Sequence, residues 1–170
     1  SRLSETVLGS VSHRVLMHGS RPTLIVRGAA RKVQRVLIAI EERNDADRIV
    51  KWLTEHPLAD PVELRVVHAI IPIGVNDPYD ALGTNTWWEG AERYAEELVK
   101  STAGKLLNPR YTVSTKVAQG NPAAVIEQEA KDMDLVVVTS HGRKGISRFL
   151  LGSVSHAVVH HVTCPILVLR

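Results

Sequence analysis

The sequence predicts an α/β fold of the Rossmann-like kind, with a parallel sheet covered by helices on both faces. Short apolar runs rich in β-branched residues alternate with amphipathic segments, in the order βαβαβαβαβ. Continuous apolar runs are typical of strands buried on both faces, and their alternation with helices favours parallel pairing. Ligands of such sheets bind at the carboxyl ends of the strands, where the strand order reverses.

Each element is expected from a local pattern. Five apolar runs predict strands at 36–40, 64–70, 111–117, 135–138 and 165–169. Apolar residues at helical spacing predict helices near 46–53, 88–102, 123–130 and 154–161. Asn44 and Asp45 are expected to cap the first of these helices, and Pro122 suits the first position of the third. A long polar connection is expected from Pro72 to about Thr86.

Composition argues against several classes of function. The 170 residues are 44% hydrophobic and 23% charged, as in folded globular domains. No apolar run approaches the ~20 residues that span a bilayer, so no membrane association is expected. The net charge is only +3, aromatic residues make up 4% and the basic residues are scattered, which argues against nucleic-acid binding. The single Cys164 cannot form an internal disulfide and favours a reducing, cytoplasmic location.

A repeat links the two ends of the chain. Residues 8–27 align without a gap to residues 151–170, which lie 143 positions later, and 11 of the 20 aligned residues are identical. This density of matches predicts two copies of one domain in tandem. We therefore expect residues 1–28 to be the C-terminal helix and strand of a first copy, and residues 29–170 to be a complete second copy.

The loop after the fourth strand carries the residues best suited to hold a ligand. It contains Gly142, and Gly152-Ser153 opens the following helix. Glycine lets the backbone approach an anion closely, and a helix N-terminus presents free N–H groups and the positive end of its dipole. With Arg143 and Lys144 at the rim, these residues could form a phosphate cradle. The alternative is a tight turn with solvated basic residues, and spacing alone does not separate the two.

The same residues resemble a family signature. The ATP-binding branch of the universal stress protein family has Gly, two residues, Gly, nine residues, and then Gly followed by Ser or Thr. Here Gly142, Gly152 and Ser153 match this pattern, while Thr139 stands at the position of the first Gly. The resemblance covers about residues 33–170, together with the partial repeat at the N-terminus.

The resemblance implies a fold and a ligand. The fold is an adenine nucleotide alpha hydrolase-like sheet of five parallel strands in the order 3-2-1-4-5, and the ligand is ATP, with Mg²⁺ beside it, bound without a catalytic residue. The residues implied around the nucleotide are Glu41, Ala69, Thr139, His141, Gly142, Arg143, Gly152, Ser153 and Val154. Backbone near Ala69 would meet the adenine edge. Glu41 stands where the family often has Asp, and we expect Glu41 and Thr139 to crowd the ligand.

The resemblance also implies a partner for the last strand, which lies at the sheet edge with unpaired backbone groups. Universal stress proteins commonly dimerise by pairing these edges in antiparallel fashion, and tandem copies resemble such a dimer within one chain. We expect Thr23–Val26 to pair with Ile166–Leu169, either of the same chain or of a second copy in a homodimer. The side chains expected to be buried by this pairing are Leu24, Val26, Leu167 and Leu169.

Histidines are the remaining candidate groups. His13 and His156 occupy the same position of the repeat, on the helix after the Gly-Ser pair, and are interpreted as surface or interface residues. His160 and His161 lie near a helix end, where the sequence supplies no companions for a metal site.

Three functions are compatible with these patterns. A nucleotide-binding regulatory domain for the stress response is favoured by the Gly142 and Gly152-Ser153 pattern. An interaction module that has lost its ligand is favoured by Thr139, Glu41 and the tandem layout. A nucleotidyl transferase on a related fold would need a His-x-Gly-His type of signature, which the sequence lacks, as it lacks the G-x-x-x-x-G-K-[ST] and G-x-S-x-G motifs. No enzymatic activity is therefore expected.

Overall fold

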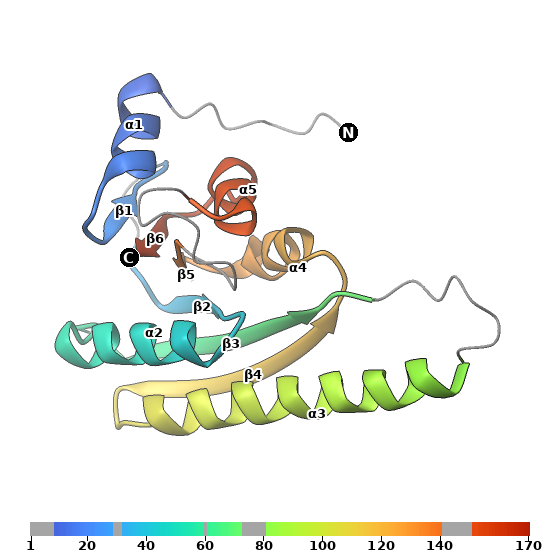
Figure 1. The fold of residues 1–170 in the computed structure, drawn as a ribbon. Coiled ribbons are helices and arrows are strands. Elements are labelled where there is room, and N and C mark those ends of the chain that lie inside the picture. Colours follow the sequence, from blue (N-terminus) through green and yellow to red (C-terminus); the bar gives the residue numbers. More distant parts are fainter. Residues whose placement is uncertain (1–8, 29–31, 60, 73–80, 141–150) are drawn as a thin grey trace.

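Six strands form one mixed sheet in the computed structural model, which describes residues 9–28, 32–59, 61–72, 81–140 and 151–170 (Figure 1). The strands are β1 (Thr23–Ile25), β2 (Arg35–Ala39), β3 (Val62–Ile70), β4 (Tyr111–Gln119), β5 (Leu135–Thr139) and β6 (Ile166–Leu169). Their order across the sheet is β1-β6-β5-β2-β3-β4. All neighbouring pairs are parallel except β1 and β6, which are antiparallel. The sheet therefore has six strands and mixed pairing, where the sequence leads us to expect five parallel strands, because β1 adds to the edge of β6.

Helices cover both faces of this sheet, and the predicted α/β fold is confirmed. They are α1 (Ser10–His18), α2 (Arg43–Glu55), α3 (Ala81–Leu106), α4 (Pro122–Glu129) with the 3-10 turn η1 (Ala130–Asp132), and α5 (Ser153–His161). Helices α2 and α3 lie on one face, and α1, α4 and α5 lie on the other (Figure 1).

The alternation of side chains along β2 divides the apolar core into two layers. Val36 and Ile38 belong to the layer under α2 and α3, whereas Leu37 belongs to the layer under α4 and α5. All three side chains are fully buried. Successive side chains of a strand point to opposite faces, so a sheet covered on both sides requires a continuous apolar run.

Two helix starts differ from the expected ones. In α2 the N-cap is Glu42, and Asp45 caps from inside the first turn, because its carboxylate accepts the N–H of Glu42 at 3.3 Å. Asn44 lies within that first turn instead of preceding the helix. Helix α3 begins at Ala81, so it already includes residues that we expected in a connection running to Thr86. Local propensity is a weak guide to such boundaries, since tertiary context overrides it.

Strands β1 and β6 pair symmetrically with respect to the sequence repeat. Leu24 lies opposite Leu167, its own equivalent in the repeat, and the residue pairs on either side are reciprocal. In such an isologous contact, the residue opposite position i of the repeat is at position j, and the residue opposite position j is at position i. The predicted antiparallel pairing of these two strands is thus confirmed, within a single chain.

The hydrogen bonds of two arginines follow the same symmetry of the repeat. Arg27 donates hydrogen bonds to the carbonyl oxygens of Val159 and Val162, and Arg170 donates one to the carbonyl oxygen of Leu16. In the repeat Arg27 is equivalent to Arg170, and Leu16 is equivalent to Val159. The last carbonyls of a helix have no partner within the helix, so each arginine satisfies the end of the helix in the other segment of the repeat.

The prediction that this pairing buries four apolar side chains is correct for only two of them. Leu167 and Leu169 are buried, but Leu24 and Val26 are 55% and 65% exposed. The core layer under α2 and α3 reaches β6 and contains no described residue of β1, so this face of β1 is left uncovered. On the opposite face, Ile25 packs into the layer that contains α1 and α5.

Candidate functional site

A buried polar contact joins the carboxyl end of β5 to α2. Thr139, the last residue of β5, donates its hydroxyl hydrogen to Asp45 Oδ1 at 2.6 Å. Asp45 Oδ2 accepts the backbone N–H groups of Glu41 and Glu42, each at 3.3 Å. Hydrogen bonds to a charged acceptor are among the stronger ones. Through these hydrogen bonds, Asp45 links the start of α2 to the segment that follows β2 and to the end of β5.

The same contact decides where the Thr139 side chain lies. Thr139 is 7% exposed and Asp45 is 3% exposed. The hydroxyl is turned toward Asp45 of α2 and is buried. The sequence could not indicate this contact, because the partner of Thr139 is distant in the sequence, on another element. The expectation that Thr139 crowds a ligand stays a prediction.

The first turn of α5 is anchored to the end of β5. Ser155 donates its hydroxyl hydrogen to the carbonyl oxygen of Thr139 at 2.6 Å. The N–H of Gly152, the N-cap residue, donates to the carbonyl oxygen of Ser140 at 2.7 Å. We expected this N–H to donate to a phosphate in the cradle, but it already donates a hydrogen bond within the fold. Gly152 therefore positions the helix start and does not offer its own amide.

The N-terminus of α5 remains the feature best suited to an anion. No side chain among the described residues caps this helix. Ser153 and Val154 are its first two residues, whose N–H groups have no acceptor within the helix, and Ser153 is exposed. Such a helix start favours negative charge through its free amides and its dipole. The other predicted cradle residues, His141, Gly142 and Arg143, lie outside the described residues.

The remaining predicted residues lie at the carboxyl ends of β2 and β3. Glu41 follows β2 and is exposed, and Ala69 is half-buried next to the last residue of β3. Between them, His68 is buried and its Nδ1 donates to the carbonyl oxygen of Ile40 at 3.0 Å. No role of His68 was predicted from the sequence, although a polar residue inside an apolar strand was an available signal.

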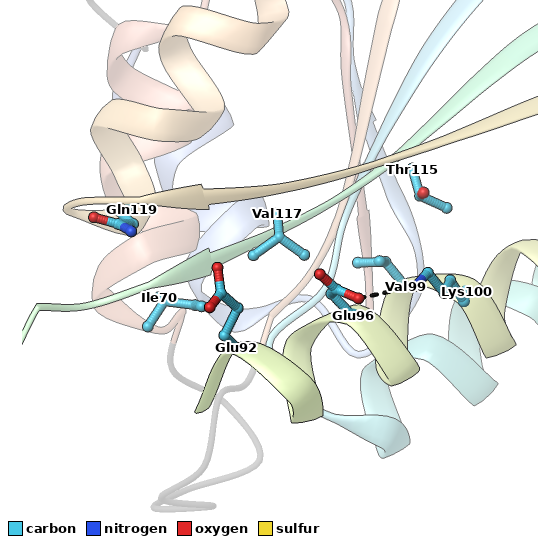
Figure 2. Close-up of a pocket in the computed structure, with 8 residues that line it drawn as sticks. All are labelled: Ile70, Glu92, Glu96, Val99, Lys100, Thr115, Val117 and Gln119. Carbon is cyan, nitrogen blue, oxygen red and sulfur yellow. Dashed lines mark hydrogen bonds and ion pairs between the residues drawn. The ribbon is translucent and has the colours of Figure 1, made fainter. Parts of the chain in front are cut away.

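A surface groove of about 330 Å³ lies away from these residues, between α3 and β4 (Figure 2). The residues that line it are Ile70, Glu92, Glu96, Val99, Lys100, Thr115, Val117 and Gln119. Glu92 and Glu96 of α3 present carboxylates to it, and Lys100 donates to Glu96 Oε2 at 2.8 Å. None of the predicted site residues lines this groove, and its carboxylates would repel a phosphate.

Three histidines come together on the opposite side of the sheet from α3. His13 of α1 meets His156 and His160 of α5, with one potential ligand atom of each within 4.8 Å of the others. The ring centroids of His156 and His160 are 4.5 Å apart, and that of His13 lies 6.1 and 6.2 Å from these two. The interpretation that His160 lacks companions is wrong, because one companion comes from the other end of the chain.

His160 is half-buried within this cluster, as His13 is, whereas His156 is exposed. Burial lowers the pKa of its imidazole, and repulsion from His156, His13, Arg27 and His161 acts in the same direction. Its Nε2 is buried and has no hydrogen-bond partner within the described part of the chain.

Within residues 9–28, 32–59, 61–72, 81–140 and 151–170, no helix combines the length and the apolar composition needed to cross a membrane.

Known proteins are similar to this chain in sequence. The sequence profile of the Universal stress protein family matches residues 32–170. A universal stress protein of Mycolicibacterium smegmatis is 31% identical over 173 residues, which cover 99% of this chain and 58% of that relative. The chain thus spans little more than half the length of this relative.

Solved structures share the fold. A functionally unknown protein of Pseudomonas aeruginosa PAO1 superposes with a TM-score of 0.70 at 19% identity, over 99% of this chain and 59% of that one. A universal stress protein family protein of Arabidopsis thaliana, solved with AMP bound, superposes with a TM-score of 0.58 at 20% identity, over 80% of this chain and 90% of that one.

Proposed function

The chain belongs to the universal stress protein family, and from this we propose that residues 29–170 form a regulatory domain that binds an adenine nucleotide in the stress response. The observation that carries the proposal is the uncapped N-terminus of α5, held beside the carboxyl end of β5. The AMP bound to the Arabidopsis thaliana relative supports an adenine nucleotide as the ligand.

The proposed nucleotide lies across the carboxyl ends of the parallel strands. We infer that these strands, which lie in the order β4-β3-β2-β5-β6, correspond to the 3-2-1-4-5 unit that the family resemblance implies. The phosphates accept hydrogen bonds from the N–H groups of Ser153 and Val154 and from the Ser153 hydroxyl. The adenine lies against backbone near Ala69, and Glu41 lies near the adenosine. ATP as the nucleotide, Mg²⁺ as its ion, and His141, Gly142 and Arg143 as further contacts belong to the same proposal.

The proposed role is binding without catalysis. The buried titratable side chains at this edge, Asp45 and His68, are used in hydrogen bonds that join strands and helices. Neither is presented to a ligand as a nucleophile or a general base would be. A cytoplasmic location is part of the proposal, and it is supported by the single, buried Cys164.

We further propose that residues 1–28 are the last helix and strand of a preceding copy of the domain. The reciprocal pairing of β1 with β6 supports this, as does the reciprocal use of Arg27 and Arg170. The greater length of the Mycolicibacterium smegmatis relative leaves room for such a copy. The two copies would then form a pseudo-dimer within one chain, in place of a homodimer.

An interaction module without a nucleotide is the second candidate. Two observations favour it: Thr139 stands where the ATP-binding pattern has Gly, and the Gly152 amide is already bonded to Ser140. In that case the pairing of β1 with β6 would be the main function, and the N-terminus of α5 would be solvated.

Calorimetry with ATP on three variants tests the nucleotide proposal. Ser153→Glu places a negative charge where the phosphates are proposed to bind, yet it suits the start of a helix and should not weaken the fold. We expect it to weaken ATP binding about tenfold or more through repulsion. Ser153→Gln adds similar bulk and removes the hydroxyl without adding charge, so it should weaken ATP binding, but less than Ser153→Glu does. Ser10→Glu adds the same charge at the equivalent position of α1 and should bind ATP nearly as well as the unmodified chain.

Each outcome separates the candidates. Equal affinity in the unmodified chain and in Ser153→Glu would show that the phosphates bind elsewhere. Absence of binding by the folded, unmodified chain to ATP, ADP and AMP would exclude the nucleotide proposal and leave the interaction module. Nucleotide that remains with the protein through purification, identified by mass spectrometry, would give the physiological ligand directly.

A further inference from the structure

The contact between α1 and α5 carries a group of side chains that the proposed nucleotide site does not use. We propose that His13, His156 and His160 bind a divalent transition-metal ion of the Zn²⁺ class. Imidazole is a preferred ligand of Zn²⁺ and of the neighbouring late first-row metals. The site is independent of the proposed function, since none of its residues lies in the proposed phosphate contacts.

The spacing of the three residues suits coordination. His156 and His160 lie one helical turn apart on α5, the i, i+4 arrangement with which a single helix presents two histidines to one ion. His13 supplies a third ligand from α1. With metal–nitrogen distances of about 2.0–2.1 Å, tetrahedral ligand atoms lie about 3.3 Å apart. The atoms here lie within 4.8 Å, so modest side-chain rotations of the exposed His156 and the half-buried His13 would close the site.

His160 supplies a second, independent observation. Its Nε2 atom is buried and has no hydrogen-bond partner among the described residues. A buried polar atom in this state calls for an unseen partner such as an ion or a water molecule. A metal ion bound to this nitrogen would remove the deficiency.

The sequence repeat explains why there are three ligands. His13 and His156 are equivalent in the repeat, and the reciprocal pairing of β1 with β6 brings equivalent positions of α1 and α5 together. His160 has no histidine counterpart, because its equivalent is Met17. The cluster is therefore a three-histidine set, which leaves a fourth coordination position for water or another small ligand.

The positively charged guanidinium of Arg27 opposes the binding of a cation at this site. Arg27 lies close enough to repel a protonated His160. Its guanidinium donates to the carbonyl oxygens of Val159 and Val162, whose partial negative charges offset part of this repulsion. Bound metal would link α1 directly to α5, and so would hold residues 9–28 against the rest of the domain.

Titration of the metal-free chain with Zn²⁺ and Co²⁺ at neutral pH tests the proposal. We expect one ion per chain, and visible Co²⁺ absorption of the intensity typical of tetrahedral coordination. His13→Gln and His156→Gln change exposed or half-exposed residues and should weaken binding at least about tenfold, since loss of even an outer-shell partner costs 10–100-fold. His160→Met, which copies the Met17 of the other helix, should do the same. His161→Gln and His18→Gln, which change exposed histidines nearby, are the matched controls and should bind as the unmodified chain does.

Thermal unfolding provides a second measurement. A ligand that binds only the folded state raises the Tm, so Zn²⁺ should raise it in the unmodified chain and in His161→Gln but not in His156→Gln. Failure of the unmodified chain to bind a stoichiometric ion would overturn the proposal. So would equal binding by the unmodified chain, His13→Gln and His156→Gln, or loss of binding in His161→Gln alone.

Discussion

The hydroxyl of Thr139 donates a 2.6 Å hydrogen bond to the carboxylate of Asp45, and both groups are buried. The two residues lie on β5 and α2, far apart in the sequence. Their contact joins β5 to α2 at the edge of the sheet where the nucleotide is proposed to bind. Loss of the hydroxyl would leave one carboxylate oxygen of Asp45 without this donor.

Replacement of Thr139 by valine should therefore destabilise the domain. We expect Thr139→Val to lower the free energy of unfolding by about 1.5–3 kcal/mol, the usual contribution of a hydrogen bond to a charged group. Thr139→Ser keeps the hydroxyl and loses one methyl group, so it should cost only about 1 kcal/mol. Urea unfolding of both variants checks this. A Thr139→Ser variant that is less stable than Thr139→Val would show that packing matters more than the hydrogen bond.

Two neighbouring residues of α1 should respond differently to truncation. Leu16 is 1% exposed in the core layer that contains α5, whereas Val15 is 53% exposed. We expect Leu16→Ala to cost about 2–5 kcal/mol, and Val15→Ala to stay within about 0.5 kcal/mol of the unmodified chain. Chemical denaturation with tryptophan fluorescence measures both. Equal stability of the two variants would mean that residues 9–28 do not share in the cooperative fold.

The same substitution at two glycines should have opposite effects. Gly120 follows β4 with φ of +139°, a conformation that residues with a side chain rarely adopt. Gly104 lies in α3, and an added Cβ would meet nothing within 4 Å. We expect Gly120→Ala to destabilise by about 1–3 kcal/mol, and Gly104→Ala to stabilise by about 0.5–1 kcal/mol. Thermal unfolding of each variant gives the sign, and a stabilised Gly120→Ala would contradict the backbone argument.

Most elements of the fold could be predicted because their signals are local. The run Val36–Ile40 indicated β2, and a strand buried on both faces requires such a run. Pro122 was predicted at the first position of α4, where it lies, with Asn121 capping the helix through the N–H groups of Ala123 and Ala124. The beginning of α3 was misjudged, because weak local propensity in that segment does not decide where a helix starts.

The candidate site could be predicted only in part. Ser153 and Val154 were expected from the Gly-Ser motif, and they form the open start of α5. The motif did not indicate that the Gly152 amide is bonded to Ser140, or that Thr139 is turned toward Asp45. Both facts depend on which elements lie beside the end of β5, and no sequence spacing encodes that.

The sequence by itself determined the alternation of strands and helices, the repeat, and the glycine and serine at the start of α5, because each depends on residues close together along the chain. Only the tertiary structure decided that β1 pairs with β6 of the same chain, and that His13 meets His156 and His160. It also decided that Leu24 and Val26 remain exposed. These features depend on which surfaces meet when elements from opposite ends of the chain pack together. Burial of the whole apolar core determines which surfaces meet.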